Sequence, residues 1–438
     1  MKRALVLLAV ALFALPAFAQ SFDALVDKEL PSLVDTYKKL HAAPELSTQE
    51  EKSSALVAAR LRELGYTVTD HVGKYDEPGL TGYGVVAIMK NGDGPVVLVR
   101  SDMDALPVAE QTGLPYASSV RAKSPSGDEV AVMHACGHDI HMTTLVGTAS
   151  VLAQLKNRWH GTLMLIGQPA EEVGKGANAM LRDGLYERFP RPAYAIALHD
   201  SADLAAGTIG YTPGYALAAV DSVNMTVRGV GGHGATPQKG KDPIVLASQI
   251  ILALQTIVSR QNSPLDPAVV TVGAIHGGTK RNIIPDEVQL LLTVRTYKPE
   301  VRKSVLAAIE RIARGLAIAA GMPDDRMPIV EVITRESSAA TYNDPELTER
   351  LAKSLRTTLG DANVTRIDPL MVSEDFGYLG LDRKIPTAML HVGGVDPAKI
   401  AAGGPLPGLH SSNWAPLPEP TIRTAIRAMT TMVLELMK

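Results

Sequence analysis

The chain has 438 residues, of which 46% are hydrophobic and 20% charged, and its formal net charge is -3. These values are ordinary for a soluble globular protein that is long enough for two domains with substantial cores. No basic excess indicates nucleic acid binding, so we expect no nucleic acid partner. The charge balance says nothing about a substrate.

The first 19 residues have the features of a secretory signal peptide. Lys2 and Arg3 precede an apolar run over 4–15, and the Ala-Phe-Ala sequence at 17–19 is a pattern that signal peptidase accepts. The apolar run is shorter than the ~20 residues that a membrane-spanning helix needs, and no later segment is predicted to span a membrane. We therefore expect a periplasmic or extracellular protein without a membrane partner.

Alternating helical and apolar strand-like segments from residue 22 to residue 198 indicate an α/β sheet with both faces covered. Helical periodicity predicts two helices within 22–65 and a third over 142–155. Short apolar runs predict strands at 85–89, 96–99, 163–166 and 195–198.

The pattern changes near Asp221, where a β-α-β-β-α-β series typical of a ferredoxin-like module begins. Its strands are expected at 222–228, 269–275, 287–296 and 329–334, and its helices at 243–258 and 301–320. Helix and strand patterns resume at Pro345, so the series is predicted to be an insertion. The expected domains are 20–220 together with 337–438, and the insertion 221–336.

The sharpest local signal is the sequence HACGHDIH, which begins at His134 and contains the single cysteine, Cys136. A thiolate and imidazoles spaced this closely around a glycine can converge on one metal ion, and Asp139 could orient an imidazole. Two alternatives stay open: a buried thiol near structural histidines, and a cysteine nucleophile served by a histidine. A lone thiol in an oxidising compartment would have to be buried or bound to a metal.

Glu171 and Glu172 form a second signal because they directly follow the predicted strand 163–166. Sites in α/β sheets gather just beyond the carboxyl ends of strands. One carboxylate could bind a metal while the other takes a proton from water. The alternative is that the pair is solvated surface charge, as most such pairs are.

Further polar residues stand at predicted strand ends. His199 closes the strand 195–198, the sequence from Arg100 to Asp104 follows the strand 96–99, and His410 lies in a Gly-Leu-His-Ser-Ser-Asn segment. Any one of these histidines would ordinarily be structural. Together with the cysteine motif and the glutamate pair, they predict a metal site.

These motifs, together with GQPAEE, GGHGATPQKGKDPI, RNIIP and SEDFGYL, resemble the family-20 metallopeptidases. The resemblance is to the amidohydrolase subfamily, which includes hippurate hydrolases, N-acyl amino acid hydrolases and auxin-conjugate hydrolases, and it covers roughly residues 30 to 435. It implies a phosphorylase/hydrolase-like α/β catalytic domain. The insertion 221–336 would be a satellite domain that forms a homodimer or a higher homo-oligomer and closes over the site.

The resemblance also implies two divalent metal ions, Mn2+ or Zn2+, bridged by Cys136. His138 and His199 would complete the protein ligands of one ion, and Glu172 and His410 those of the other. The ions would lie ~3.5–4 Å apart, activate a water molecule and polarise the amide carbonyl.

Glu171 would act in this family as the general base and then as the acid that protonates the leaving amine. His233 matches a satellite histidine that stabilises the developing oxyanion from a neighbouring subunit. Asn282 and Arg295 match positions that bind the substrate carboxylate. Purely structural roles for these three satellite residues, in a turn or on a strand surface, stay open.

The sequence departs from the pattern at two places. Many members outside the subfamily have a histidine where Arg100 stands, which favours a role for Asp102 behind the ligands. Asp200 follows His199 where subfamily relatives often have an apolar residue, so substrate preference cannot be transferred directly.

The predicted function is metal-dependent hydrolysis of the amide bond of N-acyl amino acids or similar conjugates. The alternative within enzymes is a metallocarboxypeptidase or dipeptidase acting on short peptides. A non-catalytic binding protein on the same scaffold would be expected to lose ligands or the base, and a metal-free cysteine hydrolase would resist chelators.

Overall fold

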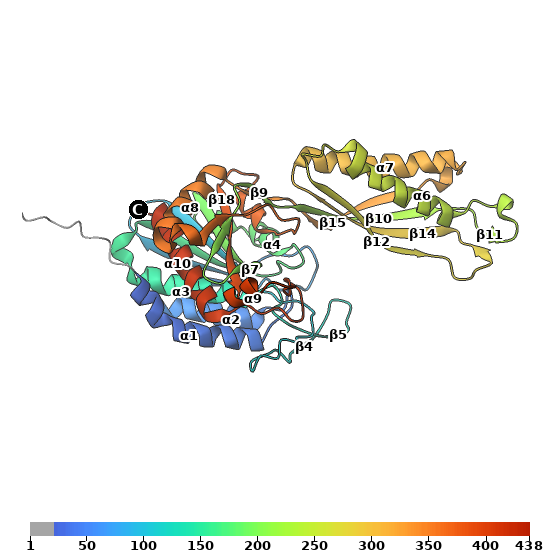
Figure 1. Cartoon of the computed structure of the whole chain (residues 1–438). Coiled ribbons are helices and arrows are strands. Elements are labelled where there is room, and N and C mark those ends of the chain that lie inside the picture. The colour runs from blue at the N-terminus through green and yellow to red at the C-terminus, as the bar shows by residue number, and fades with distance from the viewer. Residues whose placement is uncertain (1–21) are drawn as a thin grey trace, which may run out of the picture.

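The computed structural model describes residues 22–438, so the predicted signal peptide at 1–19 lies outside the described residues. Figure 1 shows two separate sheets, each with its own helices. The larger sheet has eight strands in the order β1-β2-β6-β3-β7-β18-β8-β17. These are β1 (Thr67–Val72), β2 (Gly84–Asn91), β6 (Gly161–Gln168), β3 (Val96–Asp102), β7 (Tyr194–Ala205), β18 (Thr387–Val395), β8 (Ile209–Tyr211) and β17 (Val364–Arg366).

The four central strands β6, β3, β7 and β18 are parallel, and their apolar side chains are buried on both faces. This is why they are continuous apolar runs in the sequence. Five helices pack on one face: α1 (Asp23–Ala42), α2 (Glu51–Glu63), α3 (His138–Gln154), α8 (Pro345–Leu359) and α10 (Pro418–Leu436). The other face is covered by α4 (Gly176–Arg182), α5 (Leu185–Arg188) and the turn Phe376–Gly380.

The second sheet is antiparallel and has the strand order β12-β14-β10-β15. In chain order its elements are β10 (Ala219–Arg228), α6 (Pro243–Thr256), β12 (Ala268–Gly277), β14 (Glu287–Thr296), α7 (Pro299–Ala319) and β15 (Ile329–Ser338). Both helices lie on one face of this sheet (Figure 1), and their apolar sides form a core with it. The predicted β-α-β-β-α-β series is confirmed, whereas the domain boundaries at 221 and 336 stay predictions.

The remaining short elements are connectors. They are β4 (Arg121–Lys123), β5 (Glu129–Ala131), β9 (Gly214–Leu217), β11 (Gly232–His233), β13 (Ile283–Ile284), β16 (Thr341–Asn343) and α9 (Pro397–Ala402).

Within residues 22–438, the segment Pro243–Gln261 is long and apolar enough to cross a membrane by length and composition alone. From the sequence we predict no membrane-spanning segment after the N-terminus. Burial explains part of this composition, because Leu246, Ala247, Ile250 and Leu254 pack into the core of the second sheet. The absence of a membrane partner stays a prediction.

Three predicted boundaries need correction. His199 does not close its strand, because β7 continues to Ala205 and pairs with β18 along its length. Arg100 and Asp102 belong to β3 rather than following it. Helix α3 begins at His138, so the HACGHDIH motif includes the first turn of the helix. The two strands include these polar residues because backbone pairing continues through them, as it does between Asp102 and Gln168.

Candidate metal centre

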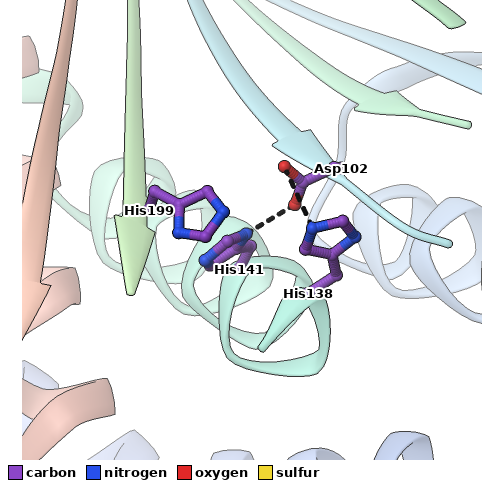
Figure 2. Close-up of side chains that lie close together, drawn as sticks. All are labelled: Asp102, His138, His141 and His199. Atoms are coloured by element: carbon purple, nitrogen blue, oxygen red, sulfur yellow. Dashed lines mark hydrogen bonds and ion pairs between the residues drawn. The ribbon is translucent and has the colours of Figure 1, made fainter. Parts of the chain in front are cut away.

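The predicted ligands gather at the carboxyl edge of the parallel strands. Figure 2 shows Asp102 at the end of β3 and His199 in β7, facing His138 and His141 in the first turn of α3. Glu171 and Glu172 follow the end of β6, the strand beside β3. Adjacent parallel strands end at the same edge, so segments far apart in sequence supply one site.

The five proposed metal ligands form a connected cluster. The Cys136 Sγ lies 3.3 Å from Nε2 of His410 and 3.6 Å from Nε2 of His199. Glu172 lies 3.5 Å from Nε2 of His410 and 3.8 Å from Nε2 of His138. Metal–ligand bonds of about 2.0–2.3 Å at tetrahedral angles separate ligand atoms by about 3.3–3.8 Å. These spacings therefore fit divalent cations.

Hydrogen bonds fix which ring nitrogen of two histidines is available. The Nδ1 of His138 lies 2.8 Å from the carbonyl oxygen of Asp104, and Nδ1 of His199 lies 2.7 Å from the carbonyl oxygen of Asp200. A carbonyl only accepts, so Nδ1 carries the proton in both rings and Nε2 presents a lone pair. The Nε2 of His138 and the Oε1 of Glu172 are buried without a hydrogen-bond partner. Such orphaned acceptors are what a cation site requires.

The cluster also has an excess of anionic groups. Burial raises the pKa of the Cys136 thiol well above its usual value, and the nearby carboxylates of Glu172 and Glu171 raise it further. Burial also raises the pKa of Glu172 to about 8, against the lowering effect of His138. Divalent cations would offset this crowding of negative charge and keep the thiolate ionised.

Glu171 has the environment that a proton carrier needs. Burial raises its pKa well above its usual value, and the carboxylates of Glu374 and Glu172 raise it further. Its Oε2 lies 3.9 Å from Nε2 of His138, which places the carboxyl beside the ligand cluster. A carboxyl with a raised pKa can accept a proton and later release it to an amine.

Backbone strain accompanies the turns that present these residues. Gly137 has a φ of 76° in the turn before α3, and His410 and Ala170 have φ values of 65° and 51°. His410 is held by its N–H, which donates to the carbonyl oxygen of Ala135 at 2.7 Å. Non-glycine residues in this region cost about 1–3 kcal/mol and cluster at functional sites.

The glutamate pair is anchored by a carboxylate from β3's C-terminal extension. The N–H groups of Glu171 and Glu172 donate to Oδ1 and Oδ2 of Asp104 at 3.1 and 3.0 Å. These two bonds hold the strained turn after Ala170, so that the two adjacent side chains diverge. Sequence reasoning noted Asp104 but gave it no role.

His141 belongs to the geometric cluster of Asp102, His138 and His199, but both of its nitrogens are already used. Its Nδ1 lies 2.5 Å from Oδ1 of Asp102, and its Nε2 accepts from the N–H of Asp200 at 2.8 Å. His141 therefore supports its neighbours and is not free to bind a metal.

A buried arginine network lies behind Glu171. The Arg100 guanidinium contacts Asp102 at 2.5 Å, Glu374 at 2.6 Å and Asp375 at 3.2 Å. It also donates to Gln168 at 3.0 Å. Sequence reasoning used the SEDFGYL segment only as a family motif and missed Glu374 and Asp375; the signal was an adjacent acidic pair beside an apolar residue.

Asp139 does not orient any proposed ligand. Its carboxylate contacts Nδ1 of His41 at 2.7 Å, and Nε2 of His41 lies 3.0 Å from Glu110. Burial lowers the pKa of His41, but hydrogen bonds to Asp139 and Glu110 outweigh burial and raise it to about 10. The result is an ion triad that ties α1 to α3 and to the loop containing Glu110.

The three satellite residues lie in the second unit. The β11 strand with His233 pairs with β13, and Gly234 N donates to the carbonyl oxygen of Asn282 at 2.9 Å, so His233 and Asn282 are neighbours. Arg295 is half-buried on β14, where burial lowers its pKa. Within residues 22–438, no hydrogen bond or ion pair links these three to the ligand cluster. A single chain in this conformation does not bring them to the site.

The model of the peptidase family M20/M25/M40 matches residues 98–433. An N-acetyl-L-cysteine deacetylase of Bacillus subtilis is 40% identical over 295 residues, which are 66% of either chain. The hippurate hydrolase of Campylobacter jejuni is 37% identical over 354 residues, covering 80% of this chain and 86% of that protein. Both relatives are named for hydrolysis of an amide.

Among solved structures, the chain resembles the Bacillus subtilis YXEP protein, described as a dinuclear metal-binding peptidase of the M20 family. The TM-score is 0.73 with 28% identity, and the match covers 93% of this chain and 98% of that one. The residues matched by the family model include every proposed ligand. The chain belongs to the M20/M25/M40 peptidase family and is an enzyme that hydrolyses amide bonds.

Proposed function

We propose that this enzyme cleaves the amide bond of N-acyl amino acids or closely similar conjugates. The relatives named as hippurate hydrolase and N-acetyl-L-cysteine deacetylase act, by those names, on acylated amino acids. The observation that carries the proposal is the convergence of Cys136, His138, Glu172, His199 and His410, next to a buried Glu171.

Five side chains would hold the two divalent cations of the proposed centre. His138 and His199 would hold one cation, Glu172 and His410 the other, and Cys136 would serve both. When bound, the cations make a water molecule nucleophilic and polarise the amide carbonyl. A thiolate and three imidazoles favour Zn2+ by softness, while Mn2+ is the other candidate and availability decides between them.

Glu171 is the proposed general base. It takes a proton from the attacking water and passes that proton to the nitrogen of the leaving amine. Its burial and its anionic neighbours support this assignment, because they hold the pKa of its carboxyl well above the usual value. Arg100 and Asp104 keep the surrounding carboxylates in place during the transfer.

We further propose that the second unit is a satellite domain that pairs two subunits. Its exposed apolar residues support this, since Val245, Leu252 and Leu265 are 55%, 73% and 88% exposed. His233 would then stabilise the oxyanion in the neighbouring subunit's site. Asn282 and Arg295 would bind the substrate carboxylate, for which a guanidinium is well suited.

A second candidate is a carboxypeptidase or dipeptidase activity on short peptides, which the peptidase name of the family favours.

We also propose that the protein is located outside the cytoplasm. This proposal is supported by the N-terminal sequence alone.

The test is a substrate panel with controlled metal content. Protein stripped of metal by a chelator should be inactive. Added Zn2+ or Mn2+ should restore activity. The restored enzyme should turn over N-benzoyl and N-acetyl amino acids faster than free dipeptides. Preference for dipeptides would favour the second candidate. Activity that survives complete metal removal would contradict the proposal and favour a thiol hydrolase.

A further inference from the structure

The carboxylate of Asp200 lies against three parts of the proposed centre: His199, His141 and the turn at Gly137. We propose that Asp200 is a positioning residue that strengthens cation binding by supporting His199 and the turn at Gly137. This inference rests on the proposed metal-dependent function.

Asp200 contacts two histidines at once. Its Oδ1 lies 3.3 Å from Nδ1 of His199 and 3.3 Å from Nε2 of His141. Its backbone bonds to the same two rings, through the N–H to His141 and the carbonyl oxygen to His199. Any residue except proline at position 200 supplies both of these backbone bonds. Only an acidic residue adds a negative charge beside both rings.

The third contact is with the turn that joins two proposed ligands, Cys136 and His138. A Cβ placed on Gly137 would lie 2.3 Å from Oδ2 of Asp200, so the carboxylate packs directly on this turn. Asp200 is fully buried, and its position is fixed by pairing of β7 with β18. One side chain therefore backs three of the five proposed ligands.

The charge of Asp200 is not balanced by a permanent cation. Asp102, the other carboxylate beneath the histidines, contacts Arg100 at 2.5 Å. Among residues 22–438, no lysine or arginine forms a salt bridge with Asp200, and neither of its carboxylate oxygens has a hydrogen-bond partner of good geometry. Its close polar neighbours are histidine rings, so this buried anion has no permanent countercharge, which is costly. A cation held by His199 would offset that cost, so the anion favours the cation-bound state.

Cobalt titration of the stripped full-length protein tests the inference. Co2+ bound to a thiolate absorbs light through charge transfer, so the same titration measures affinity and reports ligation by Cys136. Asp200→Asn keeps the shape and removes the charge, while Asp200→Val replaces the carboxylate with an apolar side chain. Asp221→Asn is the matched control, because Asp221 is an equally buried carboxylate that pairs with Arg302 in the second unit.

Asp200→Asn should bind Co2+ about 10- to 100-fold more weakly, the usual effect of losing a residue that supports a metal ligand. Asp200→Val should weaken binding at least as much, and Asp221→Asn should leave Co2+ affinity unchanged. At saturating Co2+, Asp200→Asn should recover the charge-transfer band. Circular dichroism and unfolding midpoints confirm that each variant is folded.

Wild-type affinity in folded Asp200→Asn would overturn the inference, as would a lower unfolding midpoint with no change in Co2+ binding. Failure of the proposed function gives a different result. If the wild-type protein itself binds no Co2+ with a thiolate band, the proposed metal centre fails, and this inference fails with it. A defect limited to the Asp200 variants supports both.

Discussion

At the residue scale, Glu171 and Glu172 are adjacent in sequence but have different surroundings. Glu172 contacts His410 and His138, whereas Glu171 lies near Glu374 and the arginine network. Both N–H groups bind Asp104, which turns the two side chains apart. These different surroundings suit the two proposed roles, metal ligand for Glu172 and proton carrier for Glu171.

Glu171→Gln should keep its bound cations but lose about 10²- to 10⁴-fold in turnover, the usual contribution of a general base. Glu172→Gln is the matched comparison, because it should lose cation affinity as well as activity. Metal analysis and steady-state kinetics on both proteins measure this difference. Turnover of Glu171→Gln near the wild-type rate would show that another group takes the proton.

At the element scale, the turn between β5 and α3 depends on Gly137. Its φ of 76° lies in the left-handed region, and Asp200 leaves no room for a side chain. The glycine therefore allows Cys136 to end one segment and His138 to begin the next within one site. The sequence predicted this turn from the spacing of the motif, but not the neighbour that closes it.

Gly137→Ala should weaken cation binding and lower the unfolding midpoint, because it adds a clash with Asp200 to the left-handed strain. Gly113→Ala is the control: its φ is 72°, and no atom lies within 4 Å of an added Cβ. The control should lose only about 1–2 kcal/mol of stability and keep its cation affinity. Equal cation affinity in both variants would contradict the role of the turn.

Hydrophobic periodicity predicted most elements, including β14 with its observed limits, because apolar burial on a sheet or helix follows a fixed period. Periodicity did not predict the limits of the elements that carry the site. His199 and Asp102 are polar yet lie inside strands, and α3 begins at His138 rather than at residue 142. Polar residues there are paired with one another through long-range contacts, which a local pattern does not contain.

At the scale of the whole molecule, the two sheets contribute different residues. The large sheet contains the ligand cluster, while the second unit contains His233, Asn282 and Arg295. The resemblance identified both sets, but the sequence could not give their separation, which depends on how the two units are arranged. If the site is completed across subunits, inactive variants of the two sets should complement each other.

Mixing inactive variants should restore activity if His233 acts in the neighbouring subunit. Glu171→Gln and His233→Ala should each be nearly inactive alone. In a mixed dimer, one site combines Glu171 of one chain with His233 of the other and should recover turnover. Activity after co-refolding, with mass measured by light scattering, checks this; no recovery in confirmed mixed dimers would indicate action within one chain.

The metal-free protein should become less stable as pH rises from about 5 to 8. Burial and the nearby Glu374 raise the pKa of Asp375 to about 8, and burial and the nearby Asp104 raise that of Glu50 to about 8. The folded state thus binds more protons than the unfolded state in this window, and stability falls as those protons leave. Unfolding midpoints across pH measure the slope; a rising midpoint over this range would contradict it.

We propose that Cys136 would serve both cations of the centre, and counting the bound metal tests this most directly. Equilibrium dialysis of the wild-type protein should give two divalent cations per chain. Cys136→Ser should lose tight binding of both, while His410→Ala should lose only one. Two tightly bound cations in folded Cys136→Ser would contradict the account.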